Sequence, residues 1–268
     1  MCIAFWTLDH PDYALILCTN RDEFLDRPTL DARFHSFGHD GADGDVLSGI
    51  DVLGGGTWFG VTRAGRIALL TNITEPPPAQ SFESRGALVS AHLLGEVIPR
   101  DTRFAGFNML RLVPRWEEEE GGRLAFDGVF VSNAGAGGMV EERGLREGQG
   151  GFSNAVDGEG EEWDKVREGK QEFARILESG GDLVEGLFRL LGEHPSERVV
   201  HRSELKKAIQ VVPMLIEGRM YATRLSTVVL VGRDGSVLFV ERDIWKPDGT
   251  KASPGSQRLY RFQLDVIL

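Results

Sequence analysis

Hydrophobic residues alternate with polar ones, or form short unbroken runs, in the first and last thirds of the chain. Both patterns are typical of β-strands, and the unbroken runs indicate strands that are covered on both faces. Turn residues separate neighbouring runs, which predicts hairpins near both ends of the chain. The predicted strands are residues 2–8, 13–20, 57–62, 67–72, 107–113, 122–133, 223–231, 236–242 and 258–268.

Helical periodicity is confined to the segments between these groups of strands. The predicted helices are 84–94, 162–179 and 182–191, and the last two carry clear apolar stripes. Segments rich in glycine, proline and charge predict loops at 114–123, 133–138, 157–162 and 246–257. Because none of these loops is long enough to be a domain linker, we expect one domain over residues 1–268, with a layered α+β fold.

Composition excludes some classes of binding partner and indicates a cellular location. The 41 acidic and 30 basic residues give a net charge of -11, which argues against nucleic acid or an anionic membrane as the main partner. No apolar run approaches the roughly 20 residues of a spanning helix, so no transmembrane segment is predicted. The two cysteines fit a reducing compartment, and the acidic N-terminal region does not resemble a targeting peptide. The predicted location is therefore the cytoplasm.

The candidate chemistry begins at Cys2, directly behind the initiator methionine. One interpretation is a small hydrophobic residue at a frayed strand end. The other is that removal of Met1 makes Cys2 an N-terminal nucleophile. Its free α-amine, with a reference pKa of about 7.7 to 8.0, would then accept a proton near neutral pH and act as the general base.

The first predicted hairpin places charge near this thiol. A turn over residues 9–12 would pair Cys2 with Thr19 and put Arg21 diagonally across from it on the same face. A nearby guanidinium would lower the pKa of the Cys2 thiol. The same pairing puts Cys18 on the opposite face, so no disulfide is expected, although a turn shifted by one residue would reverse this result.

Other motifs predict no metal and no required cofactor. The six histidines show no spacing typical of a metal site. The glycine-rich segment 54–58 lacks a following GK[ST] and precedes a strand, so it is not a phosphate-binding loop.

An ordered set of short motifs extends along almost the whole chain, and it resembles the NRDE family that includes transport and Golgi organization protein 2. The matching segments are MCI (1–3), NRDEFLDRP (20–28), LSGID (47–51), GGTWFGVTRAGRIALLTN (55–72), SRGALV (84–89), GFNML (106–110), FSNA (152–155) and TRLSTVVLV (223–231). The family looks like a branch of the N-terminal nucleophile (Ntn) hydrolase superfamily. The resemblance therefore implies a four-layer αββα sandwich.

A more remote resemblance, to bile salt hydrolases, penicillin V acylases and acid ceramidase, implies a set of site residues. The matching positions are Cys2 as nucleophile, Arg21 and Asp22 as the pair after the first hairpin, Asn72 and Asn154 as oxyanion donors, and Arg224 as the late arginine. Asp22 would hold the α-amine, and Arg224 would bind Asp22 or a substrate carboxylate. The alternatives are turn-capping asparagines and a surface salt bridge.

One departure from the amidase pattern affects catalysis. In those amidases the arginine and the aspartate are three positions apart, whereas Arg21 and Asp22 are adjacent. Asn20 or Glu23 is therefore an alternative to Arg21 or Asp22 at one of these two amidase positions.

The resemblance also implies a function of a different class. NRDE proteins are associated with haem trafficking, with lipid or acyl-CoA homeostasis and with secretory-pathway organisation, in mitochondria and Golgi as well as the cytoplasm. The chain would then carry haem or another apolar or amphiphilic small molecule without turning it over. No histidine or cysteine stands out in the sequence as an axial haem ligand.

Overall fold

The computed structural model describes residues 2–38, 44–76, 80–99, 101–117, 122–145, 147–195, 199 and 201–265. Met1, part of the loop predicted over 114–123, and the end of the last predicted strand lie outside these residues.

Within the described residues, the strands form two antiparallel sheets of seven strands each. Sheet A has the order β10 (Gln149–Phe152), β1 (Ile3–Thr7), β2 (Tyr13–Phe24), β12 (Arg219–Gly232), β13 (Ser236–Asp243) and β14 (Gln257–Gln263), with β11 (Met214–Ile216) paired to β12. Sheet B has the order β3 (Thr29–His35), β4 (Val46–Asp51), β5 (Phe59–Thr62), β6 (Ile67–Asn72), β7 (Phe107–Glu117), β8 (Arg123–Ser132) and β9 (Glu141–Gly144). Chain order and sheet order therefore coincide in sheet B, whereas sheet A joins strands from both ends of the chain.

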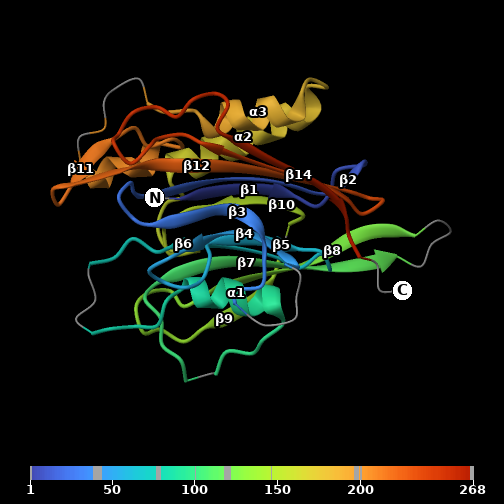
Figure 1. Ribbon diagram of the computed structural model, residues 1–268, viewed down its shortest axis with the longest axis horizontal. Coiled ribbons are helices and arrows are strands. Elements are labelled where there is room, and N and C mark those ends of the chain that lie inside the picture. Colours follow the sequence, from blue (N-terminus) through green and yellow to red (C-terminus); the bar gives the residue numbers. More distant parts are fainter. Residues whose placement is uncertain are drawn as a thin grey trace.

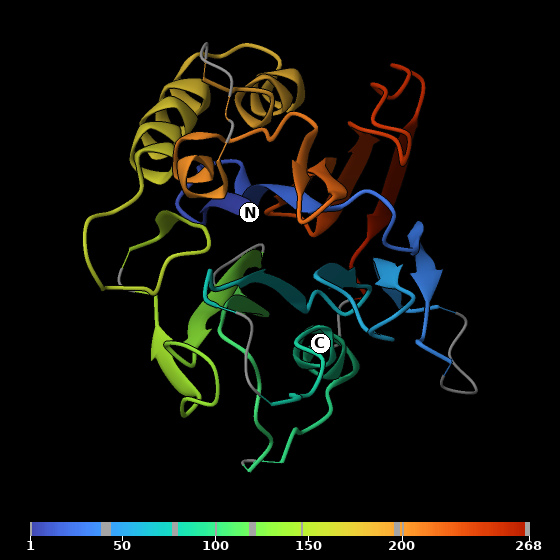
Figure 2. The ribbon, with the colours of Figure 1, turned by 90° about the vertical axis from the view of Figure 1, so that its left-hand side faces the viewer.

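Helices cover the outer face of each sheet (Figures 1 and 2). Helix α1 (Gly86–Leu94) lies on sheet B, and α2 (Asp164–Glu178) and α3 (Leu183–Leu191) lie on sheet A, next to the short helix η1 (Arg202–Lys207). The order of layers is therefore helix, sheet, sheet, helix. None of the helices described is both long enough and apolar enough to cross a membrane.

Three apolar interfaces hold these layers together. The largest lies between the sheets, where the rings of Phe59 and Phe239 stack with centroids 5.9 Å apart. A second lies between sheet A and its helices and includes the stacked pair Phe5 and Phe173. The third packs α1 against sheet B around Val89. The strands between these interfaces are covered on both faces, as their unbroken apolar runs predict.

The register of the first hairpin differs from the prediction. Ala4, not Cys2, pairs with Thr19, because β1 ends at Thr7 opposite Ile16 and the connection is longer than a four-residue turn. Continuing this register outward places Cys2 opposite Arg21. The shift is two residues, an even number, so every side chain keeps its predicted face.

Several strands were not predicted from the sequence. β3, β4, β9, β10 and β11 are short or rich in charged and small residues, and β7 and β8 extend into the segment predicted as the loop 114–123. β10 contains two glycines for a packing reason. A Cβ atom at Gly150 would come within 2.5 Å of the Trp6 ring, so glycine lets β10 pair closely with β1.

Candidate active site

A chain of hydrogen bonds joins the start of β1 to the ends of β10 and β6. The Ser153 hydroxyl donates to the Cys2 carbonyl oxygen at 2.6 Å and also lies 3.1 Å from Asn154 Oδ1. The Asn154 amide then donates to the carbonyl oxygen of Asn72. Three residues predicted far apart in the sequence are therefore brought to one end of the two sheets.

Arg21 lies between the sheets. The Arg21 guanidinium stacks on the Trp58 ring, with Cζ 3.8 Å from the ring centroid, and donates to Thr29 Oγ1 at 2.9 Å. Only 4% of the residue is exposed, and this burial lowers the pKa of Arg21. The side chain is therefore a rigid buried cation and not half of a surface salt bridge.

Asp22 points to the opposite face of β2, toward the helices on sheet A. The Asp22 carboxylate accepts a hydrogen bond of 2.5 Å from the hydroxyl of Thr223, its cross-strand partner on β12. The Asp22 carbonyl oxygen accepts from the Tyr221 hydroxyl at 3.2 Å and lies 3.8 Å from Cys2 Sγ. Because neighbours in a strand alternate in direction, the adjacent Arg21 and Asp22 approach the Cys2 region from two layers.

Asn20 has a structural role. Its amide nitrogen donates to the carbonyl oxygens of Leu191 and Ile209, each at 2.9 Å, and its Oδ1 accepts from the Ser226 hydroxyl at 2.6 Å. These contacts join β2 and β12 to the helix layer, on the face of β2 opposite to Arg21. Glu23 is partly exposed and lies 3.7 Å from Arg27.

The hydrogen bond that the structure describes for the Arg224 side chain is not to Asp22. Its guanidinium donates to the carbonyl oxygen of Arg27. Its positive charge also contributes to the lowered pKa of Arg21, which places the two guanidiniums in the same region between the sheets.

The net pKa shift of the Cys2 thiol is opposite to the predicted one, although Arg21 itself acts in the predicted direction. Burial is the largest influence and raises the pKa of Cys2, and the carboxylates of Asp22 and Glu23 raise it further. Arg21 does interact favourably with the thiolate, because the Cys2 charge in turn raises the pKa of Arg21. Desolvation outweighs this attraction, so the thiol is protonated in the resting site.

Sequence reasoning missed several residues around the thiol. The Ser153 hydroxyl donates to the Cys2 carbonyl oxygen, the Tyr221 hydroxyl donates to the Asp22 carbonyl oxygen, and the Trp58 ring stacks on Arg21. Lys165, on α2, is only 1% exposed. A signal for Lys165 was available, because it precedes Gly169 and Phe173 by one and two helical turns and so belongs to the buried stripe.

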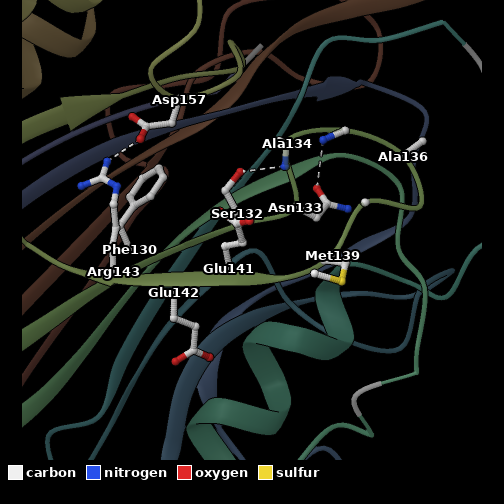
Figure 3. A pocket seen from close by; sticks show the side chains of 12 residues that line it. Phe130, Ser132, Asn133, Ala134, Ala136, Met139, Glu141, Glu142, Arg143 and Asp157 are labelled. Atoms are coloured by element: carbon white, nitrogen blue, oxygen red, sulfur yellow. Dashed lines mark hydrogen bonds and ion pairs between the residues drawn. The ribbon is translucent and has the colours of Figure 1, made fainter.

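A groove of about 720 Å³ opens beside the site, between β8, β9 and the segment 133–139 (Figure 3). On one wall the Arg143 guanidinium lies over the Phe130 ring, 4.6 Å from its centroid, and pairs with Asp157. Ser132, two residues further along β8 than Phe130, donates a hydroxyl hydrogen bond to Asn108 Oδ1 at 3.0 Å. Asn108 in turn donates to the carbonyl oxygen of Ser153 at 3.3 Å. Two hydrogen bonds therefore connect Ser132 in the groove to Ser153 in the site.

Metal-ligating residues do not gather in the described part of the chain, where no three of His, Cys, Asp and Glu could hold an ion. Neither this groove nor a second one, between the 126–128 segment and Arg233, is lined by a histidine or a cysteine. Methionine also serves as an axial ligand in some haem proteins, and Met139 lines the first groove.

The comparisons with known proteins agree with this architecture. The sequence model described as Transport and Golgi organisation 2 matches residues 1–246. The chain is 31% identical to the Transport and Golgi organization protein 2 homolog of Bos taurus over 280 residues, which cover 94% of this chain and 96% of that protein. It is 29% identical to the homolog of Homo sapiens over 293 residues, 98% of this chain and 99% of that protein.

Among solved structures, penicillin V acylase from Agrobacterium tumefaciens superposes with a TM-score of 0.50 at 10% identity, over 98% of this chain and 86% of that one. At this identity the likeness concerns the fold alone. It confirms the predicted αββα sandwich of the Ntn-hydrolase type.

Proposed function

Because this chain belongs to the Transport and Golgi organisation 2 family and has an Ntn-hydrolase fold, we propose that it is a hydrolase in which Cys2 attacks a non-peptide amide or thioester. The substrate class is a lipid-like or metabolite acyl compound. The observation that carries the proposal is the hydrogen-bond chain from Cys2 through Ser153 and Asn154 to Asn72. These hydrogen bonds support the proposal because they link the backbone of the nucleophile residue to the side chain of an amide donor.

The reaction needs the α-amine of Cys2, and hence removal of Met1. The amine takes the thiol proton as Sγ attacks the carbonyl carbon, and it returns that proton to the departing amine or thiol. Water then attacks the acyl-enzyme, gives its proton to the same amine, and releases the carboxylic acid and the thiol. The raised pKa of the buried thiol makes this proton transfer a required step.

Asn154 is the proposed oxyanion donor. Its Oδ1 is oriented by Ser153 and one amide hydrogen is directed to the Asn72 carbonyl, which leaves the second amide hydrogen for the substrate oxygen. Asn72 contributes to this arrangement through its backbone, and its side chain is exposed. Arg21 and Arg224 supply positive charge between the sheets for an anionic part of the substrate.

Asn154→Ala is expected to lower kcat about 10²- to 10³-fold, since one preorganised oxyanion donor typically contributes that much. Asn72→Ala is the matched control, and we expect only a few-fold change because the carbonyl remains. The measurement is steady-state hydrolysis of a panel of acyl thioesters and acyl anilides. Equal losses in the two variants would contradict the assignment of Asn154.

The competing proposal is a carrier of haem or of a lipid or acyl-CoA, without turnover. It rests on family membership alone. The two proposals differ in turnover: the native protein hydrolyses its ligand and Cys2→Ala does not if the chain is a hydrolase, whereas neither protein does so if the chain is a carrier.

A further inference from the structure

We propose that Glu75 is a positioning residue for Asn154: its carboxylate fixes the segment 72–75, and this segment in turn holds the oxyanion donor in place. The inference rests on the proposed function and deepens it, because it adds a residue to the same site. It also connects three segments that the proposed mechanism leaves without a role, namely SRGALV (84–89), GFNML (106–110) and the loop 133–138.

The segment 72–75 holds Asn154 at two points. The Asn154 amide donates to the carbonyl oxygen of Asn72, and the backbone N–H of Thr74 donates to the carbonyl oxygen of Asn154 at 2.8 Å. The first contact sets the direction of the Asn154 side chain, and the second fixes the backbone that carries it. The position of the oxyanion donor therefore depends on a segment that leaves sheet B at the end of β6.

Gly106, directly before β7, anchors this segment. Its carbonyl oxygen accepts from the backbone N–H of Ile73 at 2.8 Å and from the Arg85 guanidinium at 3.0 Å. Its own N–H donates to Glu75 Oε1 at 2.6 Å. A Cβ atom at Gly106 would lie 2.9 Å from both Glu75 Oε2 and the Cβ of Ile73, so a larger residue would displace one of them. Both backbone polar groups of Gly106 are therefore bonded to the segment 72–75.

The second carboxylate oxygen of Glu75 binds the loop 133–138. Glu75 Oε2 accepts from the backbone N–H of Ala136 at 2.8 Å. The loop is bonded in turn to the segment before β7, because the N–H of Gly137 donates to the carbonyl oxygen of Phe104 at 2.9 Å. Ala136 also lines the groove beside the site (Figure 3). One carboxylate therefore joins the segment that holds Asn154 to two neighbouring parts of the chain.

A carboxylate suits this junction better than a neutral side chain does. Both partners of Glu75 are backbone N–H donors, and an ionised carboxylate offers an acceptor oxygen to each of them. The Arg85 guanidinium lies close enough for its charge to interact favourably with that of Glu75. An amide has only one acceptor oxygen. Glu75→Gln therefore keeps one of the two hydrogen bonds, and Glu75→Ala keeps neither.

The test is a double-mutant cycle on kcat for the hydrolysis of acyl thioesters. Glu75→Ala should lower kcat by about 10- to 10²-fold, since a small displacement of a positioned group costs up to this much. In the Asn154→Ala protein the same substitution should change kcat by less than about twofold, because the donor that Glu75 positions is gone. Glu75→Gln should give a smaller loss than Glu75→Ala.

Asp234→Ala is the matched control. The Asp234 carboxylate also accepts two hydrogen bonds, from the backbone N–H and the hydroxyl of Ser236. It lies in the turn between β12 and β13, where the neighbouring Arg233 contacts the turn of the first hairpin and not the Cys2 end of β1. This variant should keep the native kcat.

A second readout needs no turnover. Hydrogen exchange of the Thr74 N–H, which donates to Asn154 and not to Glu75, should be about tenfold faster in Glu75→Ala, as followed by NMR. If Glu75→Ala does not fold, Glu75→Gln takes its place in both measurements, with smaller changes in the same directions.

Equal losses of kcat in the native and Asn154→Ala backgrounds would overturn the inference, because a general loss of stability does not depend on Asn154. A native kcat in folded Glu75→Ala would also overturn it and would leave the proposed function intact. Faster exchange of the Thr74 N–H, without hydrolysis of any acyl compound by the native protein, would remove the proposed function and keep the positioning of Asn154 by Glu75. Native exchange at Thr74 would contradict that positioning.

Discussion

Replacing Cys2 with alanine is expected to lower the hydrolysis of acyl thioesters and anilides by at least about 10³-fold, because the substitution removes the nucleophile and leaves only the oxyanion donor and binding contacts. Substrate binding should change little, since Cys2 is held mainly by its backbone, through the Ser153 hydroxyl. The measurement is turnover at saturating substrate beside ligand affinity, each with purified, mass-verified protein.

Cys18→Ala is the matched control for this substitution. Cys18 is fully buried, pairs with Phe5 across the hairpin and faces the helix layer. Burial raises the pKa of the Cys18 thiol far above its usual range, which makes it unreactive. Its removal should leave turnover unchanged and cost about 1 kcal/mol of stability. Full activity in Cys2→Ala would contradict the proposed mechanism and favour the carrier.

Asn20→Ala should show the largest loss of stability among the polar residues near the site. The substitution leaves the Ser226 hydroxyl and the carbonyl oxygens of Leu191 and Ile209 buried without their partner. Each buried group left unsatisfied costs on the order of 1 kcal/mol or more, so the free energy of unfolding should fall by about 3 kcal/mol. Urea denaturation measures this loss directly.

Ser226→Ala removes one of these three contacts and should cost about 1 kcal/mol. In the folded fraction of Asn20→Ala, the rate of Cys2 alkylation should match that of the native protein, because Asn20 faces the helix layer and not the thiol. A normal stability combined with slow alkylation would instead give Asn20 the place in the site that the sequence left open between Asn20 and Glu23.

The sequence predicts the layers of this fold well, because long apolar strands and striped helices are local patterns. It predicts the face of Cys18 correctly for the same reason: strand alternation survives a register shift of two residues. The strands β9 and β10 were missed because Glu-Glu-Arg-Gly and Gln-Gly-Gly-Phe carry no strand pattern of their own. Their pairing depends on neighbours such as Trp6, which lie far away in the sequence.

The site was predicted residue by residue through family resemblance, and its geometry required the structure. Motif order could not show that Arg21 and Asp22 lie in different layers, or that Arg224 bonds the Arg27 carbonyl. The shift of the thiol pKa was predicted in the wrong direction. The predicted strand pairing shows that the Arg21 charge is near Cys2, but it does not show that Cys2 is desolvated. Lys165 was passed over because a lysine between Asp164 and Val166 resembles a solvated position until its burial is known.

The central claim, that Cys2 acts as an N-terminal nucleophile, is tested most directly by the intact mass and peptide map of the mature protein after brief reaction with an acyl thioester. The account predicts a chain that lacks Met1 and carries one acyl group on Cys2, absent in Cys2→Ala. A chain that retains Met1 and gains no acyl group at Cys2 would contradict it.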